Sequence, residues 1–478
     1  MTNPAPILHT MQSLEAAWDV SSAMLGGAGH IERLAQRRLR ELIAFARASS
    51  PFYRQLYRRL PEDEATLAHL PVVTKHDLMA HFDTVLTDRD LTRKSIGQFI
   101  ADPQRVGQAL HDRYAVWTSS GSTGEPGIFV HDEHALAVYE ALELIRFRGL
   151  TSPATLAAAC LTGDRFALVA ATGGHFAGHA TAERLRWAYP WLTENVRVFS
   201  ILQSTAELAS QLDDYQPTLL ATYPTAASLL AEEQNAGRLA IGPREIWSGG
   251  ERLSDAQRAQ IKRAFGCTVR DGYGASEFLS IAWDCGHGSL HINADWVVLE
   301  PIDAAGRAVP PGVPSHSVLL TNLANRVQPL IRYDLGDSVT LLEEPCECGS
   351  AFPAMRVEGR CDDVLVLRDV SGRAVKLLPL ALMTVLEDEA DVYRFQVLQA
   401  SDTSLVLRLD PQRVETAAVQ RCQHALGRYL RAQGVPNVSL AIEQRGLEAH
   451  PVSGKLRRVV VLSANSRATV GANAAGTG

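Results

Sequence analysis

A chain of 478 residues exceeds the size at which one hydrophobic core usually suffices, so two or more structural units are expected. The apolar fraction of 46% and the charged fraction of 21% are those of an ordinary globular protein. The formal net charge of −7 argues against a general binder of nucleic acid or of anionic membranes.

The predicted elements change in kind along the chain. Apolar side chains recur at helical spacing through residues 31–49, and the first hundred residues are predicted to be mostly helical. A polar, glycine-rich segment at 118–127 precedes a helix predicted over 134–149. From 161 to 323, short apolar runs alternate with helical segments, of which 204–212 and 226–234 are the best. This alternation predicts an α/β core.

A different pattern follows residue 363. Two strand-like runs, RFQVLQA and SLVLRLD, precede a long helix and a further strand, NVSLAIE. The predicted fold class is therefore α/β, with a large multi-sheet N-terminal domain with helices over residues 1–359 and a small α+β C-terminal domain over 360–462. Residues 463–478 are small and polar, which predicts a disordered tail. The amino terminus lacks the basic start and apolar run of a secretory signal, which favours the cytoplasm.

The segment TSSGSTGEPG at 118–127 carries five hydroxyls among three glycines. Its amides and side chains can all donate to a polyanion at close range, which suits a triphosphate. It is not a GxxxxGK[ST] loop, because no lysine stands at the required place. Taken alone, a Ser/Gly run is more often an ordinary flexible loop.

Five further motifs follow that segment in order. They are SGGE at 248–251, DGYGASE at 271–277, RYDLGD at 332–337, GRCDD at 359–363 and PVSGK at 451–455. As a set they resemble the adenylate-forming superfamily of acyl-CoA synthetases and adenylation domains, over roughly residues 72–458. The wording SSGSTG, PLIRYDLGD and CxCG is most similar to the phenylacetate-coenzyme A ligase branch. Gly127 stands where many superfamily members have a lysine, a departure that this branch tolerates.

The resemblance implies an ATP- and acid-binding N-terminal domain. Tyr273 offers a flat face on which adenine could stack, and Ser276 offers a hydroxyl that could donate to a phosphate. Glu277 offers a hard carboxylate for magnesium. A simple turn that carries a surface glutamate would explain the same residues. Asp337 has the family's position for accepting bonds from ribose hydroxyls, and Arg360 for donating to the sugar or a phosphate. The resemblance assigns ATP or AMP binding to Ser119, Ser120, Gly121, Ser122, Thr123, Gly124, Gly249, Gly250, Glu251, Asp271, Tyr273, Gly274, Ser276, Asp337 and Arg360.

Catalysis is assigned by resemblance to Lys455 and Glu277. Attack of a carboxylate on the α-phosphate brings negative charges together and needs a cation where charge develops, a role that Lys455 fits. In isolation, a lysine near Arg457 and Arg458 is usually a solvated surface charge. Similarity also makes Asp362 the hinge about which a mobile C-terminal domain rotates.

A zinc site is a separate prediction. Cys285, His291, Cys346 and Cys348 supply three thiolates and one imidazole, a ligand set suited to tetrahedral structural zinc. His287 is a competing ligand, and buried free cysteines are the simpler explanation.

The substrate and the acceptor are less constrained. ATGGHFAG at 171–178 resembles the glycine-rich wall of the family's acyl pocket, so that His175 and Phe176, with Tyr223 and Gly274, would line the site of a small, aromatic carboxylic acid. A packed glycine-rich turn explains the same residues. The segment VLRDVSGRAVKLLPLAL departs from the family's pattern for receiving pantetheine. Three acceptors therefore stay open: coenzyme A, the phosphopantetheine of an acyl carrier protein, and an amine. A homodimer is also possible. The alternative class of function is a non-catalytic nucleotide-binding module.

Overall fold

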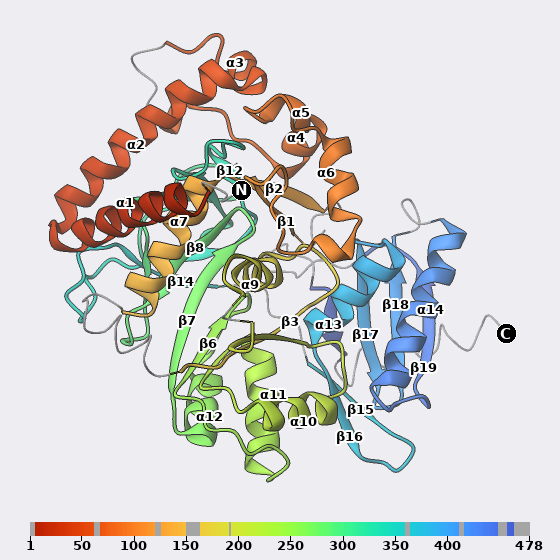
Figure 1. The fold of residues 1–478 in the computed structure, drawn as a ribbon. Coiled ribbons are helices and arrows are strands. Elements are labelled where there is room, and N and C mark those ends of the chain that lie inside the picture. The colour runs from red at the N-terminus through yellow and green to blue at the C-terminus, as the bar shows by residue number, and fades with distance from the viewer. Residues whose placement is uncertain are drawn as a thin grey trace.

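A computed structural model describes residues 5–61, 67–119, 126–149, 163–190, 193–358, 364–410, 415–447 and 457–462. Its amino-terminal part is helical, as the apolar spacing predicts. The helices there are α1 (Ala5–Leu25), α2 (Gly27–Ser49), α3 (Pro51–Leu56), α4 (Lys75–Ala80), α5 (Phe82–Val85) and α6 (Arg93–Ile100), with short 3-10 turns at Leu67–His69 and Pro103–Arg105. Figure 1 shows α1 and α2 lying along one edge of the molecule.

A nine-stranded mixed sheet occupies the centre of the fold (Figure 1). Its order is β13-β14-β9-β8-β7-β6-β5-β3-β4, parallel from β4 to β7 and antiparallel from β7 to β13. The strands are β3 (Phe166–Ala170), β4 (Val196–Ser200), β5 (Leu219–Thr222), β6 (Glu245–Gly249), β7 (Thr268–Ala275), β8 (Phe278–Asp284), β9 (Leu290–Ile292), β13 (Val339–Leu341) and β14 (Ala354–Val357).

Helices connect the parallel strands, as in other α/β sheets. They are α9 (Ala177–Ala188), α10 (Thr205–Tyr215), α11 (Pro224–Asn235) and α12 (Asp255–Phe265). The helices predicted over 204–212 and 226–234 correspond to α10 and α11. The helix predicted from residue 134 is α7 (Glu133–Leu142), which continues as a π-helix, η3 (Glu143–Phe147).

Two smaller sheets adjoin the central one. The hairpin of β1 (Ala115–Ser119) and β2 (Gly127–His131) pairs Ser119 with Gly127, and therefore closes the Ser/Gly segment at its base. The other sheet is antiparallel, in the order β10 (Val297–Ile302), β11 (Ser317–Asn322), β12 (Tyr333–Asp334). The hairpin therefore carries both ends of the 118–127 motif, and β12 carries part of the 332–337 motif.

The carboxyl-terminal part is a separate set of sheets and helices at one side of the molecule (Figure 1). Its elements are β15 (Leu365–Arg368), β16 (Ala374–Leu377), α13 (Pro379–Thr384), the π-helix η5 (Val385–Glu389), β17 (Phe395–Ser401), β18 (Ser404–Leu409), α14 (Thr416–Ala432), β19 (Ser439–Gln444) and β20 (Val459–Val461). The strands β17, β18 and β19 and the helix α14 match the predicted pattern. One cluster of buried residues runs from Ala167 of the central sheet to Val459, so both parts share a packed surface.

The predicted mixed α/β fold class is confirmed by this architecture. The domain boundary expected at 359–363 and the tail expected over 463–478 lie outside the described residues and stay predictions. None of the helices in the described part of the chain combines the length and the apolar composition that crossing a bilayer requires.

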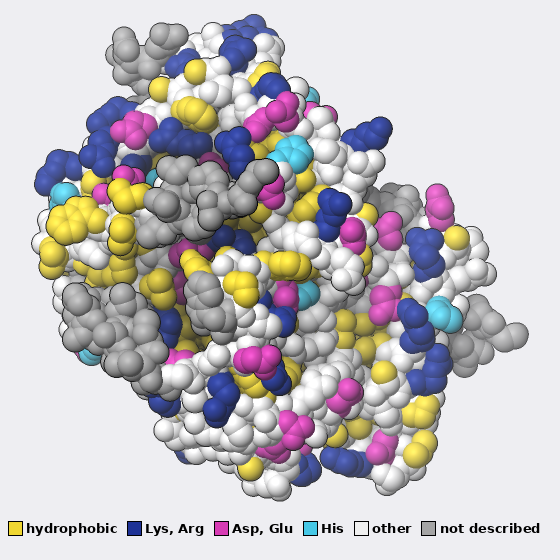
Figure 2. Space-filling model, in the orientation of Figure 1, with side chains coloured by type: hydrophobic (Ala, Val, Ile, Leu, Met, Phe, Trp, Pro, Cys, Tyr) yellow, Lys and Arg dark blue, Asp and Glu magenta, His cyan; other side chains and the backbone are white. Residues whose placement is uncertain are grey.

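Helix α1 has apolar side chains on two faces. Ala16 and Val20 are buried, whereas Leu14, Trp18 and Leu25 are 60%, 77% and 90% exposed. Figure 2 shows hydrophobic side chains on the surface at this edge, beside basic side chains near α2. The apolar pattern of α1 is therefore less one-sided than that of 31–49, where Ile31, Leu34, Leu42 and Ile43 are all buried.

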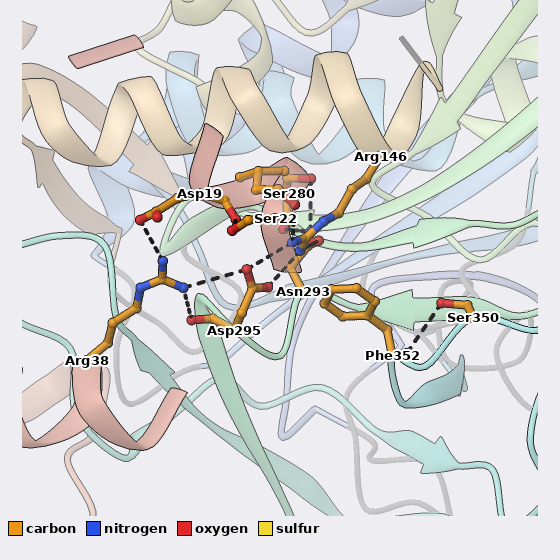
Figure 3. A network of polar contacts seen from close by, with 10 residues as sticks. Asp19, Ser22, Arg38, Arg146, Ser280, Asn293, Asp295, Ser350 and Phe352 are labelled. Atoms are coloured by element: carbon orange, nitrogen blue, oxygen red, sulfur yellow. Dashed lines mark hydrogen bonds and ion pairs between the residues drawn. The ribbon is translucent and has the colours of Figure 1, made fainter. Parts of the chain in front are cut away.

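A buried polar network ties α1 and α2 to the core (Figure 3). The Arg146 guanidinium of η3 donates to both Asp295 carboxylate oxygens, at 2.7 and 2.9 Å, and to Asn293 Oδ1 at 2.7 Å. Arg38 of α2 donates to the Asp295 carbonyl and to the Asp19 carboxylate of α1, both at 2.8 Å. The Arg146 and Asp295 side chains have no exposed surface, so their charges depend on each other.

We expect Arg146→Met to destabilise the fold by about 3 kcal/mol, because it leaves the Asp295 carboxylate buried with only part of its compensation. Arg37→Met is the matched control, since Arg37 meets Glu41 at 3.9 Å in an exposed pair. That change should cost about 0.5 kcal/mol or less. Urea unfolding measures both; equal midpoints for the two variants would contradict the importance given to the network.

Candidate functional site

The glycine-rich motif residues gather where parallel strands end. Tyr223 follows β5, Gly249 ends β6, and Gly249 pairs with Gly272 of β7. Because ligands of open α/β sheets bind beyond the carboxyl ends of the strands, this edge is the natural place for a site.

A tight hairpin joins β7 to β8 and carries Ser276 and Glu277 at its tip. Ala275 pairs with Phe278 across the turn. A Cβ atom added to Gly274 would lie 1.9 Å from the Leu279 carbonyl oxygen, a distance that no side chain can tolerate. Glycine at 274 therefore lets the two strands approach closely enough to turn after Ala275.

Glu277 is a buried carboxylate, with only 4% of its surface exposed. Tyr333 Oη donates to Glu277 Oε1 at 2.8 Å, and Asn322 Nδ2 donates to the Glu277 carbonyl at 2.9 Å. Burial raises the pKa of Glu277, while the positive charge of Lys75 and the Tyr333 hydrogen bond oppose that rise. These contacts hold the Glu277 carboxylate in one orientation, close to the motifs that are predicted to bind the nucleotide.

Two other predicted residues are in direct contact. Tyr273 Oη donates to Asp337 Oδ2 at 2.9 Å, which joins the 271–277 and 332–337 motifs. Ser276 Oγ donates to the Thr118 carbonyl at 3.2 Å, and the Ser276 carbonyl lies 2.9 Å from His131 Nε2. Three motifs far apart in the sequence therefore meet around this hairpin.

Ser119 marks the described end of the Ser/Gly segment. Its Oγ accepts hydrogen bonds from Gly127 N at 3.2 Å and from Lys75 Nζ at 3.1 Å. The other predicted residues of the segment, together with those of the hinge and the carboxyl-terminal motif, lie outside the described residues: Ser120, Gly121, Ser122, Thr123, Gly124, Arg360, Asp362 and Lys455.

One residue of the SGGE motif, Glu251, contacts the first turn of helix α11. Glu251 Oε2 accepts from Thr225 N at 3.1 Å and from Thr225 Oγ1 at 2.7 Å, close to the first turn of α11. Gly250 has a φ of +78°, and a Cβ there would lie 3.0 Å from the Tyr223 ring. Asp271 lies beside Asp284 in the adjacent strand, and burial raises the pKa of Asp271 to about 7.

Three of the predicted pocket residues, His175, Phe176 and Tyr223, lie near the Ser/Gly segment or near the buried cluster around Ala171. The His175 carbonyl accepts from Thr118 N at 2.8 Å, and Phe176 bridges to Thr118, so both adjoin the Ser/Gly segment. His175 is 2% exposed, and the centre of its ring lies 5.2 Å from that of the Phe99 ring; burial lowers the pKa of this histidine. Phe176 and Tyr223 both pack against the buried cluster that includes Ala171.

The four predicted zinc ligands form one cluster. Their ligand atoms lie within 4.8 Å of one another, with Cys285 Sγ 3.6 Å from Cys346 Sγ and His291 Nε2 3.2 Å from Cys348 Sγ. A tetrahedral zinc ion would separate such atoms by roughly 3.5–3.8 Å, so the set fits zinc. His291 Nδ1 lies 2.8 Å from the Phe352 carbonyl, which leaves Nε2 as the free ligand atom. His287 is exposed and outside the cluster.

Three residues at this site were not singled out from the sequence. Tyr333 lies inside the quoted RYDLGD motif, so its position was visible but its contact with Glu277 was not. Asn322 and Lys75 belong to no motif, and only the fold brings Asn322 to Glu277 and Lys75 to Ser119.

Known proteins resemble this chain in sequence and in fold. A family profile described as "AMP-binding enzyme" matches residues 31–315. Phenylacetate-coenzyme A ligase of Thermus thermophilus is 26% identical over 359 residues, covering 71% of this chain and 73% of that protein. The Escherichia coli protein of the same name is 26% identical over 365 residues, covering 71% and 74%. A crystal structure of 2-hydroxyisobutyryl-CoA ligase with 2-HIB-AMP and CoA has a similar fold, with a TM-score of 0.55, 22% identity and coverage of 95% and 94%.

The raised pKa of Glu277 predicts a pH-dependent cost of burying this carboxylate. The folded state holds the proton more tightly than the unfolded state, so stability falls as the pH rises from the ordinary value of 4.5 through the folded pKa. Each unit of rise is worth about 1.4 kcal/mol. Glu277→Gln keeps an acceptor for Tyr333 and removes the charge, so its stability advantage over the native protein should grow with pH.

Urea unfolding at pH 5 and pH 8 measures this difference. Glu15→Gln, at an exposed position on α1, is the control and should show no such growth. A constant difference between Glu277→Gln and the native protein at both pH values would contradict the raised pKa.

Proposed function

This chain belongs to the family of AMP-binding enzymes, and we propose that it activates a carboxylic acid as an acyl adenylate and transfers the acyl group to coenzyme A. The observation that carries the proposal is the meeting of three motifs at one edge of the sheet. The hairpin that holds Glu277 contacts the Ser/Gly segment through Ser276 and Thr118, and it contacts the 332–337 motif through Tyr273 and Asp337.

In the proposed first step, a carboxylate oxygen of the acid attacks the α-phosphorus of ATP. The bond from that phosphorus to the bridging oxygen breaks, and pyrophosphate leaves with the electron pair. Tyr273 would bind adenine with its ring, and Asp337, 2.9 Å from the Tyr273 hydroxyl, would accept from the ribose hydroxyls. Glu277 is a fitting ligand for Mg²⁺, which neutralises phosphate charge when bound. Lys455 would stabilise the charge that develops on the α-phosphate.

The second step we propose is attack of a thiol on the acyl adenylate, with AMP as the leaving group. Rotation of the carboxyl-terminal domain about Asp362 would exchange the residues that face the adenylate between the two steps. Coenzyme A is favoured as the acceptor because both phenylacetate ligase relatives carry it in their names. The phosphopantetheine of an acyl carrier protein and an amine are the alternatives.

An aromatic acid is the proposed substrate class. Phenylacetate, named for two relatives, is aromatic. Phe176 and Tyr223 supply aromatic surface near the strand ends, and the buried His175 adjoins the Ser/Gly segment. Aromatic rings pack favourably against such side chains, which supports the choice.

We expect pyrophosphate release to depend on both ATP and an acid, with aryl acids the best of a panel of aryl and alkyl acids. Lys455→Ala should lower the adenylation rate by about 100-fold or more, as expected for loss of a group that stabilises the transition state. Its affinity for AMP should change little. Adding coenzyme A, carrier protein or amine afterwards identifies the acceptor. Release of no pyrophosphate with any acid would favour a nucleotide-binding module instead.

We also propose that Cys285, His291, Cys346 and Cys348 bind a structural zinc ion. Four protein ligands leave no open coordination position, so the ion would join the loop after β8 to the loop after β13 rather than activate water. The Phe352 carbonyl beside His291 supports this arrangement. Phe352 also packs 4.3 Å from the Arg146 guanidinium, so the site adjoins the buried polar network (Figure 3).

Metal analysis should find about one equivalent of zinc in protein purified without chelator. Cys348→Ala should lose most of that zinc and unfold at lower temperature, because one of four ligands is gone. Cys267→Ala, a free cysteine outside the cluster, is the matched control and should keep the metal. Less than about half an equivalent in the native protein would count against the site.

A further inference from the structure

Two neighbouring carbonyl groups at the tip of the β7–β8 hairpin are both bound by buried side chains. The Ser276 carbonyl lies 2.9 Å from His131 Nε2, and the Glu277 carbonyl accepts from Asn322 Nδ2 at 2.9 Å. His131 ends β2 and Asn322 ends β11, and both residues are fully buried. Tyr139 of α7 lies between them, with its Oη 2.8 Å from Asn322 Nδ2 and 3.2 Å from His131 Nδ1. The His131–Tyr139–Asn322 network therefore connects the two carbonyls.

The direction of each hydrogen bond in this network follows from its ends. Asn322 Oδ1 accepts from two backbone N–H groups of the chain that follows it, at 2.9 and 3.1 Å, so Nδ2 is the amide atom that faces Tyr139. Because the Tyr139 hydroxyl accepts from Asn322, its own proton goes to His131 Nδ1. The proton of the neutral imidazole then lies on Nε2, where it donates to the Ser276 carbonyl.

Aromatic rings pack around the network and keep the imidazole neutral. The ring centres of Trp117 and His131 are 4.1 Å apart, and those of Phe278 and Tyr139 are 4.8 Å apart. Burial lowers the pKa of His131 to about 3. A neutral imidazole has a single ring N–H, so Nε2 donates only while Nδ1 accepts. The Tyr139 hydroxyl therefore fixes the tautomer of His131.

The strand that carries His131 also supports the carboxylate of Glu277. Side chains two residues apart in a strand point to the same face, so Phe129 and His131 share one face of β2. The ring centre of Phe129 lies 6.1 Å from that of Tyr333, in an edge-to-face arrangement. Tyr333 is the residue that donates to the Glu277 carboxylate. One face of β2 thus contacts the hairpin and packs against the tyrosine that orients its carboxylate.

Ser276 is bound on two sides by the β1–β2 hairpin. Its Oγ donates to the Thr118 carbonyl of β1 at 3.2 Å, and its own carbonyl faces His131 of β2. The strands β1 and β2 are paired along their whole length, so these two contacts are held in a fixed relation. Loss of the His131 contact would free one side of Ser276 and, with it, the backbone of Glu277.

We propose that His131 is a positioning residue for Glu277: through its fixed tautomer it holds the Ser276 carbonyl, and it thereby sets the orientation in which Glu277 meets magnesium-bound ATP. The inference rests on the proposed function for its nucleotide, but not on the identity of the acid or the acceptor. Residues that orient a metal ligand from behind change metal affinity without touching the metal. His131 would act in this way through the backbone of the hairpin.

Equilibrium binding of ATP, with magnesium and with EDTA, measures this role. His131→Phe keeps a ring beside Trp117 and removes both hydrogen bonds of the imidazole. Its affinity for ATP with magnesium should fall about tenfold or more, as for other residues that orient a metal ligand, whereas its affinity for ATP in EDTA should change by about threefold or less. His131→Gln should regain part of the loss, because its amide nitrogen can donate to the Ser276 carbonyl.

The double variant His131→Phe/Tyr139→Phe separates positioning from stability. His131→Phe alone leaves the Tyr139 proton buried without its acceptor, and the double variant removes that hydroxyl as well. The urea midpoint should therefore partly recover in the double variant, while the affinity for ATP with magnesium stays low, because the Ser276 carbonyl still lacks its donor. Tyr215→Phe is the matched control, since it removes a buried hydroxyl that donates to the Phe166 carbonyl at 3.2 Å. It should lower the urea midpoint and leave the affinity unchanged.

Native affinity for ATP with magnesium in His131→Phe would overturn the proposal, and so would recovery of both affinity and urea midpoint in the double variant. If His131→Phe does not fold, Tyr139→Phe takes its place, because it frees the tautomer of His131. An affinity equal to that of Tyr215→Phe would then overturn the proposal.

The proposed activity can fail separately from this role. Binding needs no acid, so a selective loss of affinity in His131→Phe supports the role of His131 even where no acid releases pyrophosphate. That result would contradict the proposed activity alone. A native protein that binds no ATP would contradict both.

Discussion

The buried hydrogen bond from Tyr333 to the Glu277 carboxylate is the constraint on which the site depends. An ionisable carboxylate with almost no exposed surface is costly unless donors and a nearby cation compensate it. Tyr333 supplies the donor, Lys75 supplies the positive charge, and Asn322 holds the backbone of Glu277. Each lies in a different segment, so the carboxylate can be oriented only when those segments are packed together.

Packing of the amino-terminal helices serves the same end. The Val73–Tyr333 bridge joins the segment before α4 to β12. The Arg146–Asp295–Arg38 network joins α1 and α2 to the core of the amino-terminal domain. The Cys/His cluster adjoins that network through Phe352. These contacts give the first hundred residues a role in building the site, beyond the packing role that their helical pattern suggests.

Much of the fold and of the candidate site could be predicted from the sequence, and there is a physical reason why the rest could not. Alternating apolar runs predicted the α/β core, and the Cys/His spacing predicted a cluster that the fold does bring together. Tyr273 and Asp337 were identified through short motifs, because a motif preserves local geometry. Lys75 could not be identified in this way, since its contact with Ser119 depends on strand pairing between distant segments. The choice between His287 and His291 likewise required the packing of β9 against β14.

The central claim is that a carboxylate oxygen attacks the α-phosphorus of ATP. An acid that supports pyrophosphate release, labelled with ¹⁸O in its carboxylate, tests this most directly when the reaction is run with an acceptor and the AMP is analysed by mass spectrometry. The account predicts AMP that carries one labelled oxygen. Unlabelled AMP, or label found in inorganic phosphate beside ADP, would contradict it.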